Sequence, residues 1–184
     1  MNPATIIWFR NDLRLKDNPA LAKAARESST IIPLYIHSPE QEGELSIGAA
    51  SRWWLHQSLA SLTAELSKMG LSLIIKRNKT AGAALLEVLE ESGAKNVYWN
   101  RRYEPHLIEI DKNIKSELKE HGINVQSFYG NLLFEPWEVT TSTGTPDKVF
   151  TPTGEPVLHC QSPGPPAILK IRPNLLKKSS TLYP

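Results

Sequence analysis

Short apolar runs alternate with longer stretches of helical periodicity over the first 130 residues of the chain. Five of the runs are rich in β-branched or aromatic residues and too short for helices, which is typical of buried strands. They cover residues 5–9, 30–36, 71–75, 96–99 and 123–128. The segments between them predict helices at 20–26, 48–69, 80–91 and from Pro105 to just before Gly122. Strands that alternate with helices indicate βαβ units, so the pattern predicts an α/β fold: a Rossmann-like, doubly wound, five-stranded parallel sheet with helices on both faces.

The predicted helices begin and end with characteristic residues. Asn18 is a good N-cap, and Pro19 suits the first helical position because its missing N–H would stay unpaired there anyway. Thr80 can cap the helix at 80–91 in the same way. Glycine accepts the left-handed conformation at a helix C-terminus without steric cost. A glycine follows three of the predicted helices, at Gly70, Gly93 and Gly122.

The helix at 48–69 has a clear apolar stripe. Its apolar positions recur at intervals of three and four: Leu55, Leu59, Leu62, Leu66 and Met69. Trp53 and Trp54 are neighbours and diverge by about 100° around the helix, so both cannot face the core. We expect one in the core and the other at a ligand slot or a domain interface. The polar segment 38–46 before this helix, with Pro39 and Gly43, predicts a loop.

The alternating pattern stops after Tyr129. Eight of the fourteen prolines lie from Pro146 onward, with Thr and Ser clusters between them. Such a composition is typical of an extended linker rather than of another βα unit. We therefore divide the chain into an α/β domain at 1–130 and an extended, Pro-rich tail at 131–184.

Composition and charge narrow the function classes. No apolar run approaches the roughly 18 residues that span a bilayer, and the lone Cys160 cannot form an intramolecular disulfide, so we expect a soluble, cytoplasmic protein. The whole chain has a net charge of +2, but no acidic residue follows Glu155, and the first 155 residues carry −2. A slightly acidic body argues against a self-sufficient nucleic-acid binder. The five histidines share no metal-ligand spacing, so we expect no metal site.

Ligands of such a sheet bind outside the carboxyl ends of the strands. The relevant loops follow Phe9, Ile36 and Trp99. None of them carries Gly-x-Gly-x-x-Gly, and the chain has no Gly-x-x-x-x-Gly-Lys phosphate loop or Gly-x-Ser-x-Gly elbow. The residues alone thus indicate a ligand-binding α/β domain, and they argue against an ordinary NAD or ATP enzyme.

Five ordered blocks of the sequence resemble DNA photolyases and cryptochromes. The blocks are WFRNDLRLKDNPAL at 8–21, ASRWWLHQSL at 50–59, VYWNRRYEP at 97–105, GNLLFEPWEV at 130–139 and KVFTP at 148–152. The resemblance implies the N-terminal, light-harvesting domain of a deoxyribodipyrimidine photolyase. Members of this family use light-excited reduced FAD to split pyrimidine dimers in DNA after flipping the lesion out of the duplex.

The resemblance also implies cofactors and partners. The N-terminal domain of family members holds an antenna chromophore, which is a folate such as methenyltetrahydrofolate or a deazaflavin or FMN. FAD and UV-damaged DNA belong to a helical domain that we expect to be absent from this chain, so the chain alone is expected to be inactive. We also expect a monomer. His106 and Leu107 stand where folate-binding relatives have Asn-Glu, and Arg102 stands where deazaflavin-binding relatives have a carboxylate. The resemblance therefore does not identify which of these chromophores the chain would bind.

We place the ligand among side chains from the three loops and the helix that follows the second strand. The candidate cofactor-binding residues are Arg10, Asn11, Asp12, Ser38, Arg52, Arg101, Arg102 and Glu104. Two alternatives stay open for some of them: Asp12, Arg14 and Asp17 can pair with one another and cap the loop, and Glu104 can serve the helix N-terminus that follows it. For the chain as a whole, the alternatives are a nucleotide-binding enzyme domain and a remnant with only an interaction role.

Overall fold

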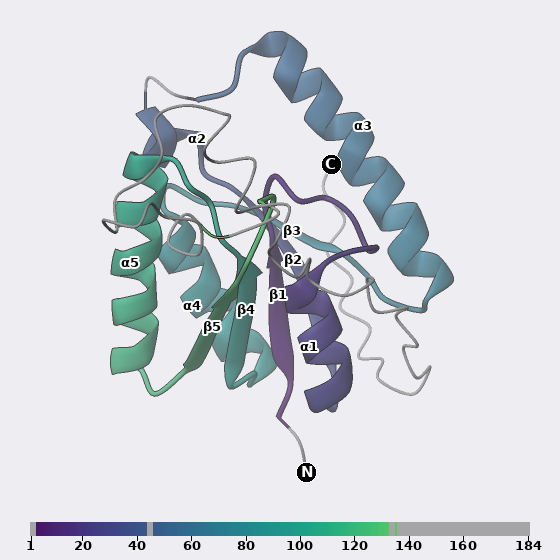
Figure 1. The fold of residues 1–184 in the computed structure, drawn as a ribbon, viewed down its shortest axis with the longest axis vertical. Coiled ribbons are helices and arrows are strands. Elements are labelled where there is room, and N and C mark those ends of the chain that lie inside the picture. Colours follow the sequence, from purple (N-terminus) through teal and green to yellow (C-terminus); the bar gives the residue numbers. More distant parts are fainter. Residues whose placement is uncertain (1–2, 44–45, 133–134, 136–184) are drawn as a thin grey trace, which may run out of the picture.

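A single parallel sheet organises the protein (Figure 1). The computed structural model describes residues 3–43, 46–132 and 135. The sheet has five strands in the order β3-β2-β1-β4-β5, and every neighbouring pair is parallel. The strands are β1 (Thr5–Phe9), β2 (Ile31–His37), β3 (Ile74–Arg77), β4 (Asn96–Asn100) and β5 (Asn124–Phe128). The strand order reverses between β1 and β4, as in a Rossmann-like doubly wound fold, so the predicted fold class is confirmed.

Helices cover both faces of this sheet (Figure 1). They are α1 (Pro19–Glu27), the short α2 (Pro39–Glu42), α3 (Ala49–Lys68), α4 (Ala81–Ser92) and α5 (Pro105–Glu120). The residues of β1 alternate between two cores. Ile6 and Trp8 pack in the core formed with α4 and α5, whereas Ile7 and Phe9 pack in the core formed with α1 and α3. All five β1 residues are buried, which is why this strand has no polar face in the sequence.

The helix ends follow the local signals of the sequence. The Asn18 side chain caps α1 by accepting a hydrogen bond of 3.1 Å from the backbone N–H of Leu21. Thr80 caps α4 through the N–H of Ala83. Gly93 ends α4 with φ of 65°, a left-handed conformation in which any side chain would be strained. These predicted caps are confirmed.

Two elements differ from the prediction. The third strand covers Ile74–Arg77 rather than 71–75, because the backbone of Leu71 is still tied to the end of α3, which closes at Lys68. The N–H of Leu71 donates to the carbonyl of Leu66, and the Leu71 side chain is buried beside α3. The segment 38–46 is not wholly a loop, since Pro39 starts the single turn of α2.

The prediction that one tryptophan of the pair lies in the core is also wrong. Trp53 and Trp54 are 63% and 69% exposed, so neither lies in the core. Only the C-terminal half of α3 packs on the sheet, through Leu62 and Leu66. The N-terminal half extends past the carboxyl ends of the strands (Figure 1), where there is no core for a tryptophan to enter.

The predicted tail at 131–184 lies almost entirely outside the described residues, so its extended conformation stays a prediction. Within the part of the chain that the structure describes, no helix combines the length and apolarity needed to cross a bilayer. The described residues also contain no cluster of three or more His, Cys, Asp or Glu side chains that could hold a metal ion.

Candidate ligand-binding site

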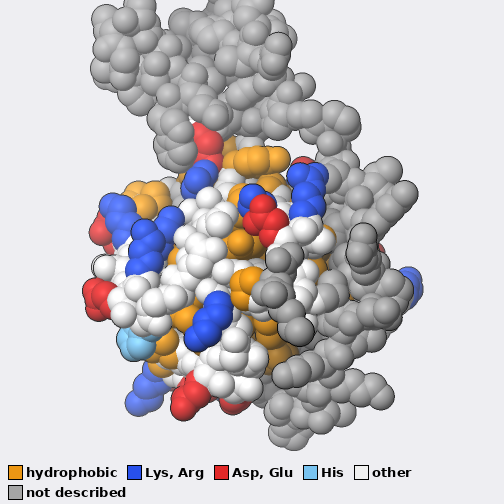
Figure 2. Space-filling model, turned by 90° about the horizontal axis from the view of Figure 1, so that it is seen from below, with side chains coloured by type: hydrophobic (Ala, Val, Ile, Leu, Met, Phe, Trp, Pro, Cys, Tyr) orange, Lys and Arg blue, Asp and Glu red, His pale blue; other side chains and the backbone are white. Residues whose placement is uncertain are grey.

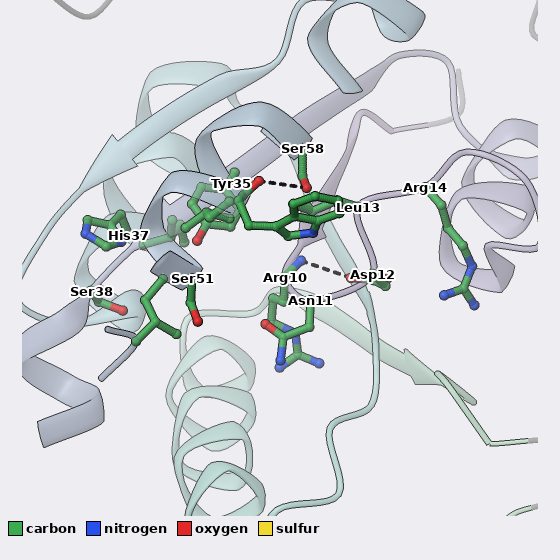
Figure 3. A pocket seen from close by; sticks show the side chains of 14 residues that line it. Arg10, Asn11, Asp12, Leu13, Arg14, Tyr35, His37, Ser38, Ser51 and Ser58 are labelled. Atoms are coloured by element: carbon green, nitrogen blue, oxygen red, sulfur yellow. Dashed lines mark hydrogen bonds between the residues drawn. The ribbon is translucent and has the colours of Figure 1, made fainter. Parts of the chain in front are cut away.

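A cavity of about 410 Å³ lies at the carboxyl ends of β1 and β2 (Figure 3). The segment after β1, the end of β2 and the N-terminal half of α3 form its walls. It is lined by Arg10, Asn11, Asp12, Leu13, Arg14, Tyr35, Ile36, His37, Ser38, Ile47, Ser51, Trp54, Leu55 and Ser58. Its volume is within the range of pockets that bind small molecules and cofactors. Its position agrees with the general rule for ligands of open parallel sheets.

Helix α3 contributes one continuous stripe to this cavity. Ser51, Trp54, Leu55 and Ser58 recur at helical spacing and all line the wall. The Ser58 hydroxyl donates a hydrogen bond of 2.9 Å to the backbone carbonyl of Trp54, four residues earlier (Figure 3). The first half of α3 therefore borders the cavity, whereas its second half packs in the core through Leu62 and Leu66.

The crevice between β1 and β4, where the strand order reverses, is filled by Arg10. This side chain is 5% exposed. Its Nη1 donates to the Asp111 carboxylate at 2.5 Å, and its Nη2 donates to the backbone carbonyl of Asn100. The guanidinium carbon lies 4.8 Å from the centre of the Trp8 ring, a cation–π contact. Burial lowers the pKa of Arg10, and the nearby Asp111 carboxylate opposes this effect.

Asn100 and Asp12 hold the first loop in place beside Arg10. Asp12 accepts a hydrogen bond of 2.9 Å from the backbone N–H of Arg10 and another from the Asn100 amide. The same Asn100 amide group donates to Asn18, and its carbonyl oxygen accepts from the N–H of Ala20. One side chain from β4 thus joins the loop after β1 to the start of α1. This network fixes the position of Asp12, which lines the cavity.

The predicted local pairing in the first loop is present as well. Arg14 lies 3.7 Å from the Asp17 carboxylate and donates to the Asp17 backbone carbonyl. Asp12 caps the loop backbone by accepting a hydrogen bond from the N–H of Arg10, and it also lines the cavity. The structural interpretation of these residues is therefore confirmed, and it is compatible with ligand contact by Asp12.

Five of the eight predicted site residues border a cavity. Arg10, Asn11, Asp12 and Ser38 line the large one, and Arg102 lines a smaller one that adjoins it. A ligand role for all eight residues stays a prediction.

The other three predicted site residues line neither cavity. Arg52 is exposed and donates to the carbonyl of Ile47. Arg101 forms an ion pair with the buried carboxylate of Glu135. Glu104 is exposed at the N-cap position of α5, and its carboxylate accepts from the N–H of Tyr103 at 3.1 Å rather than capping the helix.

On the β2 side of the cavity, Ser38 was the one predicted ligand residue. Tyr35, Ile36 and His37 at the end of β2, and Ile47 before α3, also line the cavity but were not among the candidates. The sequence did indicate the three residues of β2, because they end a predicted strand whose carboxyl end was already expected to face the ligand. Tyr35 and Trp54 add aromatic rings to a wall in which polar and charged side chains outnumber the apolar ones. This lining suits a planar ligand that carries several polar groups.

Comparison with known proteins identifies the family. The model of the DNA photolyase family matches residues 5–170. This chain belongs to the DNA photolyase family. The photolyase-type domain seen here has the α/β fold of the N-terminal domain in that family.

Relatives of this photolyase-family chain include both cryptochromes and photolyases. Cryptochrome-2 of Arabidopsis thaliana is 44% identical over 150 residues, which are 82% of this chain and 24% of that protein. The crystal structure of a class III photolyase from Agrobacterium tumefaciens is 37% identical, with a TM-score of 0.78, over 91% of this chain and 34% of that one. An archaeal photolyase from Sulfolobus tokodaii, described with two FAD molecules and a novel light-harvesting cofactor, has 27% identity and a TM-score of 0.63 over 72% of this chain and 31% of its own. The chain thus spans about a quarter to a third of the length of these relatives.

Proposed function

We propose that this chain is the light-harvesting domain of a deoxyribodipyrimidine photolyase, and that its 410 Å³ cavity holds the antenna chromophore. The observation that carries the proposal is this cavity at the carboxyl ends of β1 and β2, in a chain of the photolyase family. The chromophore would be a folate, such as methenyltetrahydrofolate, or a deazaflavin or FMN. When bound, it would absorb near-UV or blue light and pass the excitation to FAD.

The side chains around the cavity suit binding rather than bond-breaking chemistry. An antenna needs a fixed distance and orientation, and it needs no acid, base or nucleophile from the protein. Rigid strand ends and the loop fixed by Asn100 supply the fixed geometry. Tyr35 and Trp54 can contact a planar ring system, and Asn11 and Ser38 can hydrogen-bond to its edges.

The activity of the longer protein is part of the same proposal. FAD and UV-damaged DNA would bind in the helical domain that the relatives carry beyond the region matched here. The described part of the face in Figure 2 mixes Lys and Arg with Asp and Glu side chains, which suits a domain that does not itself bind DNA. A cytoplasmic location and a monomeric state also belong to the proposal. The lone cysteine supports the location, because a chain with one cysteine cannot form an intramolecular disulfide and suits a reducing compartment.

The proposal is tested by adding candidate chromophores to the purified 184-residue chain. Methenyltetrahydrofolate, FMN and a deazaflavin are each mixed with the protein, and gel filtration is monitored at the absorption band of the ligand. We expect one of them to elute with the protein. Ser58→Trp fills the cavity and should abolish this co-elution, whereas Ser61→Trp, on an exposed position of the same helix, should retain it.

Two results would contradict the antenna role. Micromolar binding of ATP or AMP, with no uptake of any chromophore, would favour a nucleotide-binding enzyme domain. No uptake of any of these ligands by folded protein would leave a remnant that serves only in protein contacts.

A further inference from the structure

The residues that follow β5 are held at the carboxyl edge of the sheet by contacts with two other loops. The loop after β4 lies against Gly130, where a Cβ atom would be 2.5 Å from the carbonyl oxygen of Arg101. The loop after β1 contributes Arg14, which donates to the Asn131 side chain at 3.1 Å and to the Gly130 carbonyl at 3.4 Å. After β5 ends at Phe128, the chain therefore turns back over β4 toward the loop after β1.

Glu135 fastens the far end of these contacts. It is only 6% exposed. One oxygen of its carboxylate, Oε1, accepts from Nη1 of Arg101 and also from the Tyr103 hydroxyl, the latter at 3.2 Å. Nη2 of Arg101 donates in turn to the carbonyl of Ser127 in β5, at 3.0 Å. The guanidinium group thus connects the last strand to a residue beyond it, and we call Arg101, Tyr103 and Glu135 the clasp.

The Tyr103 hydroxyl joins two points of the chain after β5. It accepts from the backbone N–H of Gly130 at 3.2 Å and donates to the Glu135 carboxylate. Burial raises the pKa of Tyr103, so the hydroxyl keeps its proton and can donate well above neutral pH. Because both points meet on one hydroxyl, a displacement of either leaves polar groups without their partners.

The energetics of the clasp favour a role in geometry over a role in stability. A buried carboxylate loses hydration that an ion pair restores only in part, so such pairs are weak evidence for stability, and fixing one arrangement is their best-attested use. Any other path of the chain that keeps Glu135 buried would leave its charge without Arg101. The clasp therefore selects one position for the residues that follow β5.

We propose that Glu135 is a positioning residue, which fixes the chain beyond β5 relative to the ligand cavity. This inference rests on the proposed function, because an antenna needs a fixed distance and orientation to the FAD that receives its excitation. In the longer protein of that proposal, the following domain is attached through this segment, and the clasp sets its orientation. Tyr103 and Glu135 line neither of the two cavities, so this role is separate from ligand contact.

Spin-label distance measurements on the 184-residue chain test the clasp. The native cysteine is replaced (Cys160→Ser), and nitroxide labels are attached to the variants Leu132→Cys and Ser61→Cys, at exposed positions after β5 and on α3. We expect one narrow distribution of distances between the labels. Tyr103→Phe and Glu135→Ala should each broaden it roughly twofold, because the segment then samples several positions.

Two matched variants separate the clasp from general effects of substitution. Tyr129→Phe removes an exposed hydroxyl beside the segment, and Glu109→Ala removes the exposed partner of Lys112 on α5. Neither should change the width of the distribution. All variants are compared where circular dichroism shows them to be folded. A distribution as narrow in Tyr103→Phe and Glu135→Ala as in the parent, or a broad one in the parent, would overturn the proposal.

Hydrogen exchange of the unaltered protein is a second measurement, which does not depend on how the variants fold. The Gly130 amide should exchange about a hundredfold more slowly than in an unstructured peptide, because it donates to Tyr103. Exchange at the rate of an unstructured peptide would also overturn the clasp.

Chromophore uptake distinguishes failure of the clasp from failure of the antenna site. Tyr103→Phe and Glu135→Ala should retain the co-elution seen with the parent chain. A loss of co-elution in these folded variants would place the two residues in the ligand site and overturn the positioning role. If the parent takes up no chromophore, the antenna proposal fails, while the distance distributions still decide whether the clasp holds the segment.

Discussion

The carboxylate of Asp111 on α5 accepts a hydrogen bond of 2.5 Å from Nη1 of Arg10, which lies 101 positions earlier at the end of β1. Its other oxygen accepts from Nη2 of Arg102 at 2.6 Å. A single carboxylate thus connects β1, the segment after β4 and α5, directly behind the candidate site. It also compensates the charge of two guanidinium groups that are largely removed from solvent.

Removal of Asp111 should therefore destabilise the fold strongly. Asp111→Ala leaves two buried cations without an ion-pair partner, and we expect the free energy of unfolding to fall by about 3–5 kcal/mol. Urea denaturation followed by circular dichroism measures this change. Glu27→Ala removes the exposed partner of Lys23 on α1 and should have almost no effect. Equal losses in the two variants would show that the Asp111 contacts contribute no more than a surface ion pair.

The adjacent tryptophans of α3 should differ in ligand binding but not in stability. Trp54 lines the cavity, and Trp53, equally exposed, does not. Trp54→Ala should weaken binding of the chromophore by about tenfold, because it removes an aromatic contact from the wall. Trp53→Ala should leave the affinity unchanged. Fluorescence titration of both variants gives the two dissociation constants, and a larger effect of Trp53→Ala would contradict the placement of the site.

Most of the fold was readable from local signals. Residues 5–9 are a buried strand in both prediction and structure, because a β-branched and aromatic run of that length has few alternatives. Asn18 and Gly93 mark helix ends at the predicted positions, since capping depends on a few adjacent residues. Position 71 was misassigned because the apolar residue after a helix-ending glycine can pack back on that helix as easily as it can start a strand.

The site was only partly readable, because it depends on contacts between distant residues. Helical periodicity shows that Trp53 and Trp54 face different ways, but it cannot show that this half of α3 lies beyond the sheet. Likewise, Arg101 follows β4 just as Arg10 follows β1, and both were expected at the ligand. In the structure Arg101 instead pairs with Glu135, 34 positions later, and nothing in the local sequence indicates that partner.

The cap at Asn18 should contribute more than an ordinary helix cap. Its side chain accepts hydrogen bonds from the N–H of Leu21 and from the buried amide of Asn100. Asn18→Ala removes both, and we expect a loss of about 2–3 kcal/mol in the free energy of unfolding. Thr80→Ala removes only the cap of α4 and should cost about 1 kcal/mol. Chemical denaturation of both variants measures the two changes in the free energy of unfolding. Equal changes would mean that the contact with Asn100 contributes nothing to stability.

Gly130 lies where the chain passes close to the segment after β4. A Cβ atom at this position would be 2.5 Å from the backbone carbonyl oxygen of Arg101, which is closer than two such atoms can approach. The N–H of Gly130 also donates to the Tyr103 hydroxyl, at 3.2 Å, and this hydroxyl in turn donates to the Glu135 carboxylate. Gly130→Ala must shift the backbone and disturb both contacts, so we expect a loss of about 2 kcal/mol in the free energy of unfolding.

Gly82 provides the contrasting variant. A Cβ atom there would be 2.7 Å from Oε2 of Glu117, but this is the end of a flexible side chain that can move away. Gly82 is the second residue of α4, where alanine is favoured over glycine by less than the roughly 1 kcal/mol of a helix interior. Gly82→Ala should therefore leave stability unchanged or raise it slightly, while Gly130→Ala lowers it. Thermal and urea unfolding of the two variants test this difference, and a Gly130→Ala protein as stable as the parent would show that the backbones at 101 and 130 are not in close contact.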